Sequence, residues 1–89
     1  METNAIERVK AQVSAIVNYS GINTIEGLRE QRTAIVERYR EGIEKMKESG
    51  LFKDEEIKEV LKYASALNEQ RYSQAYTDVK CTLRNEFVF

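Results

Sequence analysis

Residues 54–84, DEEIKEVLKYASALNEQRYSQAYTDVKCTLR, contain neither proline nor glycine. Apolar residues recur through this stretch at steps of three and four, which is the spacing of one face of an α-helix. Three acidic residues open the stretch, where they suit the positive end of a helix dipole. The sequence therefore predicts one long helix over about 53–85, with a break near Asn68 as the alternative.

Two shorter helical patterns precede the long one, over about 3–19 and 24–49. Each has an apolar face at helical spacing, and a Ser-Gly pair marks the end of each. Glycine easily takes the left-handed conformation that closes many helices. We therefore expect Gly21 to end the first helix and Gly50 to end the second.

The beginnings of the second and third helices also carry sequence signals. Asn23 and Glu26 have the spacing of a capping box, in which each side chain bonds the other residue's backbone N–H. Phe52 and Ile57 are spaced as a hydrophobic staple if Lys53 is the cap of the third helix.

These patterns predict an all-α fold with residues 1–89 as a single helical domain. Short loops make consecutive helices antiparallel neighbours. The expected architecture is an elongated antiparallel three-helix bundle or hairpin with a long C-terminal helix. At about 1.5 Å per residue the helices are roughly 25, 39 and 46 Å long. The third helix should therefore extend beyond the first by several turns.

The C-terminal half of the third helix carries an apolar stripe that we expect the chain to leave uncovered. An uncovered stripe of this kind indicates a protein partner. The residues expected to bind that partner are Tyr72, Ala75, Tyr76, Val79, Leu83, Phe87 and Phe89.

The apolar tail, residues 86–89, has three open alternatives. It can dock on its own bundle, dock on a partner, or pair as a short edge strand.

The composition argues against most catalytic chemistry. The chain has no histidine, which removes the usual general base and the commonest metal ligand. No Gly-rich phosphate-binding motif is present, and the paired carboxylates lie on faces expected to be solvated. We therefore predict a non-enzymatic protein with no catalytic residue, no cofactor and no metal site.

The net charge of −1, from 14 basic and 15 acidic residues, gives no basic excess for nucleic acid. The alternative hypothesis is a nucleic-acid-associated regulator that acts as a dimer. Its contacts would come from the densest basic feature, Arg29, Arg32, Arg38 and Arg40. Acidic residues interleave these arginines, which favours a helix face with intrahelical pairs.

The remaining features concern compartment and partner. No signal peptide is recognisable, and no run reaches the ~18 apolar residues of a membrane span. The single cysteine, Cys81, cannot form an internal disulfide and is interpreted as an ordinary small apolar residue. We expect a cytoplasmic interaction module of the adaptor, assembly-chaperone or inhibitor type. It would form a homodimer through the third helix, with a second client protein possible on the same surface.

Overall fold

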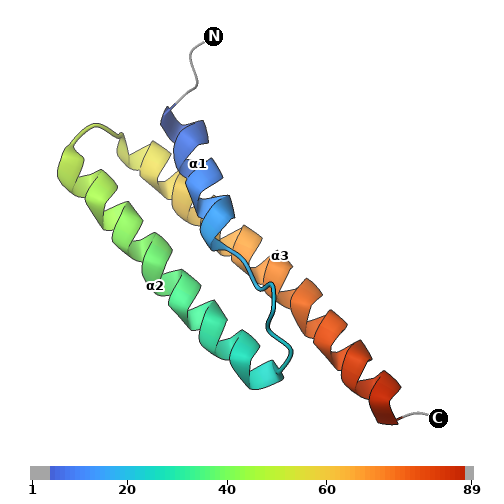
Figure 1. The fold of residues 1–89 in the computed structure, drawn as a ribbon. Helices are drawn as coiled ribbons and strands as arrows, with labels where there is room; N and C mark the ends of the chain where they lie inside the picture. Colours follow the sequence, from blue (N-terminus) through green and yellow to red (C-terminus); the bar gives the residue numbers. More distant parts are fainter. Residues whose placement is uncertain (1–4, 88–89) are drawn as a thin grey trace.

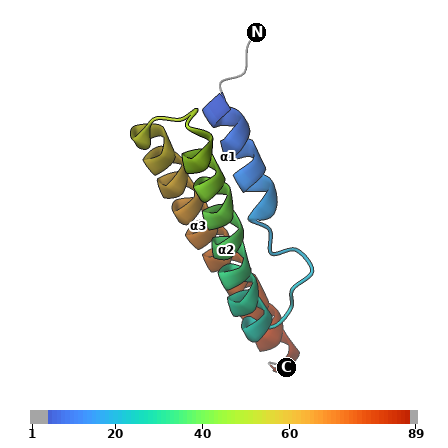
Figure 2. The same ribbon diagram turned by 90° about the vertical axis from the view of Figure 1, so that its left-hand side faces the viewer.

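The computed structural model describes residues 5–87, with side chains through residue 82, and this part of the chain folds into three helices. They are α1 (Ala5–Ile16), α2 (Ile25–Ser49) and α3 (Asp54–Phe87). α2 and α3 form an antiparallel hairpin, and α1 lies beside it near the end where the hairpin closes (Figure 1). α1 contacts α3 more extensively than α2, and Figure 2 shows α1 set to one side of the hairpin. The all-α fold expected from the sequence is confirmed.

The core runs along the line where the three helices meet. Its most completely buried apolar side chains are 0–1% exposed, and each of the larger ones contributes roughly 1.5–3 kcal/mol by leaving water. These side chains are Val17, Leu28, Ile35, Val60 and Ala64. These residues come from α2, α3 and the segment after α1, and Ile6 and Val13 of α1 are also buried in the core.

The molecule is elongated, as the helix lengths predict. Its principal extents are 57 × 28 × 18 Å and its radius of gyration is 16.0 Å. A compact domain of this size has a radius of gyration of only about 12 Å. The difference arises because α3 continues past the first turn of α2 (Figure 1).

The first helix is shorter than the predicted range of 3–19, of which residues 3 and 4 lie outside the described part. α1 ends at Ile16, and residues 17–24 connect it to α2 without helix. Val17 and Tyr19 turn into the core, at 0% and 8% exposure. Gly21 has the expected positive φ of 80°, but it serves a turn in this connector rather than the end of α1. The contacts made by the connector override the helical periodicity of the sequence.

The start of α2 corrects the predicted capping box of Asn23 and Glu26. Thr24 is the cap, because its hydroxyl accepts a 3.0 Å hydrogen bond from the backbone N–H of Gly27. A Cβ at Gly27 would lie 2.8 Å from the Thr24 hydroxyl oxygen and 2.9 Å from a methyl of Ile22. Glycine at this position therefore allows the connector to close tightly on the first turn of the helix.

The turn between α2 and α3 follows the sequence signals closely. Gly50 closes α2 with φ 68°. The backbone N–H of Lys53 donates to the carboxylate of Glu56 at 2.9 Å, so Lys53 does cap α3. Phe52 and Ile57 both pack into the core, whereas Leu51 is 82% exposed. α3 is continuous through Asn68, so the alternative of a break there is wrong.

Candidate partner-binding surfaces

The described part of the apolar stripe on α3 is largely covered by the chain itself. Val79 is 7% exposed, and Tyr72, Ala75 and Tyr76 are half-buried against the core. The expectation that the chain leaves this part uncovered is therefore wrong. The 17–24 connector and the first turn of α2 provide the cover, because Tyr19, Ile22 and Ile25 pack into the same core.

The last predicted partner-binding residues lie beyond this covered region. Leu83 and Phe87 belong to helical backbone, but their side chains are outside the described part of the structure. Phe89 and the end of the 86–89 tail lie outside the described residues. Their role in binding a partner stays a prediction.

An aromatic cluster holds the connector against α3. The rings of Tyr72 and Tyr19 meet edge-on at a centroid distance of 5.9 Å. The rings of Tyr72 and Tyr76 are tilted to each other at a centroid distance of 6.1 Å. The guanidinium of Arg32 lies 4.8 Å from the centre of the Tyr72 ring and pairs with Glu69. Ring pairs and cation–π contacts each add about 0.5–1.5 kcal/mol beyond area burial. The cluster therefore joins the connector, α2 and α3.

A buried hydrogen bond lies beside this cluster. The hydroxyl of Tyr19 donates to the side-chain oxygen of Asn68, which is only 2% exposed. Burial raises the pKa of Tyr19 to about 12, and the nearby carboxylate of Glu69 acts in the same direction. The positive charge of Arg32 opposes the shift. A polar residue within an apolar helical face is the sequence signal for such a pair. Asn68 is such a residue, and it is also where the sequence offers the alternative of a break in a continuous helix.

A second polar contact joins α3 to the end of α1. The guanidinium of Arg71 donates to the backbone carbonyls of Ser14 and Val17, at 2.6 and 2.7 Å, and to the Ser14 hydroxyl at 2.9 Å. A helix C-terminus leaves such carbonyls without partners and carries partial negative charge. α1 has no basic residue in its own last turn, so Arg71 supplies the missing cap.

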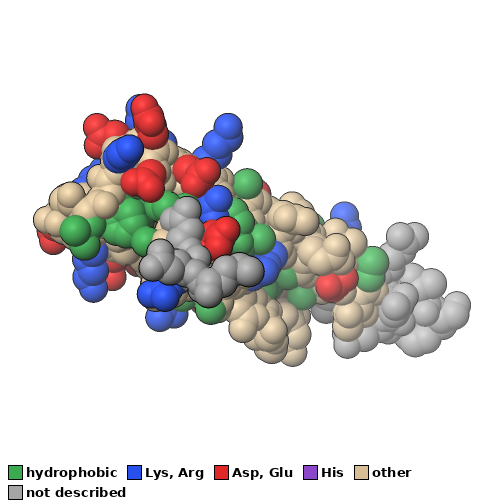
Figure 3. Space-filling view, turned by 90° about the horizontal axis from the view of Figure 1, so that it is seen from above, with side chains coloured by type: hydrophobic (Ala, Val, Ile, Leu, Met, Phe, Trp, Pro, Cys, Tyr) green, Lys and Arg blue, Asp and Glu red, His purple; other side chains and the backbone are tan. Residues whose placement is uncertain are grey.

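The four arginines proposed for nucleic acid do not form one cluster: Arg29 and Arg40 share one side of α2 about three turns apart, and Arg38 lies opposite them. Arg32 is occupied by Glu69 and the aromatic cluster. The step from Arg29 to Arg38 is about two and a half turns, which places them on opposite sides of α2. Among the coloured side chains of Figure 3, acidic and basic groups are interspersed without a region of one sign.

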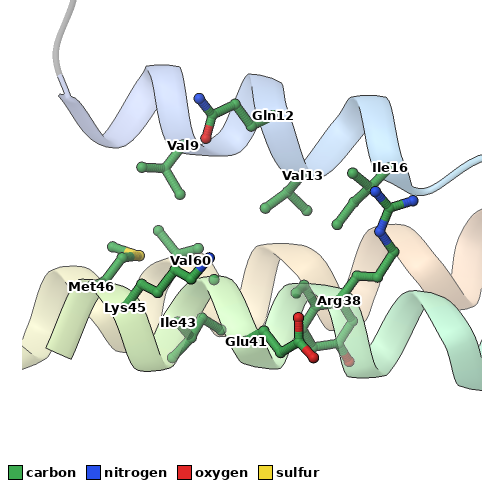
Figure 4. Close-up of a pocket in the computed structure, with 12 residues that line it drawn as sticks. Val9, Gln12, Val13, Ile16, Arg38, Glu41, Ile43, Lys45, Met46 and Val60 are labelled. Carbon is green, nitrogen blue, oxygen red and sulfur yellow. The ribbon is translucent and has the colours of Figure 1, made fainter. Parts of the chain in front are cut away.

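A groove lies between α1 and α2, with a volume of about 320 Å³. Val9, Val13 and Ile16 line it from α1, as Figure 4 shows. Ile43 and Met46 line it from α2, and its floor includes Val60 of α3. The polar residues at its mouth are Gln12, Arg38, Glu41 and Lys45.

Helical spacing places the apolar groove residues on the inner faces of their helices, but it does not reveal a groove between them. Val9 and Ile16 are half-buried rather than buried. The one sequence signal is Gly42, a position without a side chain in the predicted helix over 24–49. At this position α2 has no side chain that could pack against α1.

The remaining chemical features of the described residues concern metal binding, membranes and the cysteine. No group of three or more His, Cys, Asp or Glu side chains there is placed to hold a metal ion. No helix in the described part is long and apolar enough to cross a membrane. Cys81 is exposed on α3.

In comparisons with known proteins, no family model, no curated protein and no solved structure matches this chain.

Proposed function

We propose that this protein is a small non-enzymatic interaction module that self-associates through the C-terminal end of α3. The observation that supports the proposal most directly is the extension of α3 beyond the first turn of α2. In Figure 1 no other helix lies beside the last turns of α3. These turns keep helical backbone as far as Phe87.

A helix end without neighbours gains little stability alone. Isolated helices shorter than about 12–15 residues are marginal in water, and most helix stability comes from packing an apolar face. The sequence continues the apolar spacing from the buried Val79 to Leu83 and Phe87. A second copy offers the same end, so a two-fold symmetric pair would stabilise both.

This arrangement suits an adaptor, an assembly chaperone or an inhibitor, which act by binding rather than by chemistry. The same end of α3 could accept a client protein in place of the second copy. We place the protein in the reducing cytoplasm, because its single cysteine has no partner in the chain for a disulfide.

The alternative of a nucleic-acid-associated regulator has less support. Of the four arginines, one is engaged within the bundle, and Arg29 and Arg38 lie on opposite sides of α2. A salt-sensitive shift of duplex DNA by the protein would revive this alternative.

Solution mass by light scattering behind size exclusion, over a dilution series, tests the main proposal. We expect a dimer near twice 10.3 kDa that dissociates on dilution. Leu83→Ala should shift the equilibrium towards monomer, because it truncates an apolar side chain at the C-terminal end of α3, where no other helix packs. Ser73→Ala is the matched control, since Ser73 is an exposed α3 residue beside the covered part of the stripe.

Two results would contradict the proposal. A monomer at every concentration would show that the end of α3 does not self-associate. If Leu83→Ala has the same dimer dissociation constant as the original protein, and the same helix content by circular dichroism, the interface lies elsewhere.

A further inference from the structure

The groove between α1 and α2 has the dimensions of a site for helical side chains. Its α1 wall runs from Val9 to Ile16 and its α2 wall from Tyr39 to Met46. Each span is about 10.5 Å, or two helical turns. The volume of about 320 Å³ is at the lower end of the range for ligand sites.

The groove is open for an identifiable reason. Gly42 stands on its α2 wall, and a Cβ built there would meet no atom within 4 Å. α1 also contacts α2 less than it contacts α3, so nothing draws the two walls together. As a result Val9 and Ile16 remain half-exposed along the opening.

The charges at the mouth of the groove indicate the chemistry of an occupant. Arg38 and Lys45 are exposed, and neither makes an ion pair with any side chain that the structure describes. They are two turns apart on α2, and Arg38 reaches towards Ile16 while Glu41 stays beside α2 (Figure 4). The groove mouth therefore carries two cations and one carboxylate, Glu41, which leaves an excess of positive charge. Arg38 and Lys45, two turns apart, can complement two carboxylates at the same spacing on an occupant.

We propose that this groove binds an amphipathic helix of a partner protein, with aliphatic side chains two turns apart and carboxylates flanking them. The aliphatic side chains enter between α1 and α2, and the carboxylates pair with Arg38 and Lys45. Helices commonly bind in this way, with anchors at i, i+3 or i+4, and i+7. The buried Met46 at one end suits the site, since methionine adapts to different apolar shapes.

The groove geometry favours a helix over a free amphiphile such as a fatty acid. The groove is open along its length rather than closed around a chain, and its two walls present residues at helical spacing. Two cations two turns apart also match two carboxylates on a helix better than the single carboxylate of a fatty acid.

The probe for this site is a stapled helical peptide with leucines at i, i+4 and i+7 and glutamates beside them. A matched peptide has lysine in place of each glutamate. Fluorescence anisotropy with the full chain should show salt-sensitive binding of the glutamate peptide and about tenfold weaker binding of the lysine peptide. Gly42→Leu should weaken binding of the glutamate peptide by at least about tenfold, because the new side chain fills the groove.

Gly42→Ala is the matched control, since its methyl group enters open space and leaves most of the groove free. Arg38→Glu with Lys45→Glu should reverse the preference between the two peptides. The proposal fails if the glutamate peptide does not bind, if it binds the lysine version equally well, or if Gly42→Leu has no effect. It also fails if the groove binds laurate instead of the peptide. In that case laurate binds, Gly42→Leu abolishes its binding, and the peptide does not bind.

This inference and the proposed self-association are separable. The groove lies beside α1, at the opposite end of the molecule from the last turns of α3 (Figure 1). Gly42→Leu should leave the solution mass unchanged, and Leu83→Ala should leave peptide affinity unchanged.

Discussion

Arg71 donates hydrogen bonds to both the backbone carbonyl and the hydroxyl of Ser14, at 2.6 and 2.9 Å, across 57 residues of sequence. The same guanidinium also reaches the carbonyl of Val17. One side chain of α3 thus ends α1 and fixes the direction in which the chain leaves it. The connector can then place Tyr19 against Asn68 and Tyr72.

Arg71→Met should lower the free energy of unfolding by about 1.5–3 kcal/mol, the range for hydrogen bonds to a charged group. Methionine keeps an apolar stem but leaves the carbonyls at the end of α1 without a donor. Urea unfolding followed by circular dichroism measures the change. Gln70→Met, at the exposed neighbouring position, should have little effect. Equal midpoints for the two variants would show that the end of α1 does not depend on Arg71.

Alanine should have opposite effects at the two glycines within α2. At Gly27 the new Cβ would lie 2.8–2.9 Å from Thr24 and Ile22, so something must move and stability should fall by roughly 1–3 kcal/mol. At Gly42 the methyl meets nothing, and the better helix propensity of alanine should raise stability by about 0.5–1 kcal/mol. Thermal unfolding of the two variants gives the comparison, and a gain at Gly27 would contradict the close approach.

Thr24→Ala should cost about 1 kcal/mol, because it removes the hydroxyl that accepts from the backbone N–H of Gly27. Asn23→Ala should cost much less, since Asn23 is exposed and lies outside the cap. Urea midpoints distinguish the two. The reverse order would restore the capping box that the sequence alone predicts.

Local signals predicted most of the fold correctly. Gly50 ends α2 and the Lys53–Glu56 contact begins α3. Both ends of the turn depend on residues close in sequence, so sequence patterns reveal them. The end of α1 depends instead on Arg71, which is more than fifty residues away. Periodicity continues past Ile16 and therefore overestimates the helix. Tertiary contacts of this kind are invisible to patterns that are only one helix long.

The candidate surfaces show the same division. The apolar stripe on α3 could be predicted from spacing, but its cover could not, because Tyr19 and Ile22 belong to a connector with no regular pattern. The groove was missed because sequence patterns assign each helix a face without giving the distance between helices. Gly42 opens the groove only in combination with the position of α1.

The buried hydroxyl of Tyr19 links stability to alkaline pH. Its pKa is raised from 10.0 to about 12, chiefly because burial disfavours the tyrosinate. Above pH 10 the unfolded chain loses this proton while the folded protein keeps it. The stabilising contribution is therefore complete below pH 10 and is lost as the pH rises to about 12. A shift of this size corresponds to roughly 2–3 kcal/mol.

Tyr19→Phe should remove this part of the alkaline loss while lowering stability at neutral pH, because Asn68 loses its hydrogen-bond donor. Urea unfolding at intervals between pH 8 and 12 measures both effects. All other titratable groups are the same in the two proteins, so the difference between their curves isolates Tyr19. Tyr63→Phe is the matched control, because it removes a half-buried tyrosine hydroxyl beside Lys10 instead of the one that bonds Asn68. Parallel curves for Tyr19→Phe and the original protein would show that the tyrosine hydroxyl ionises without opening the connector.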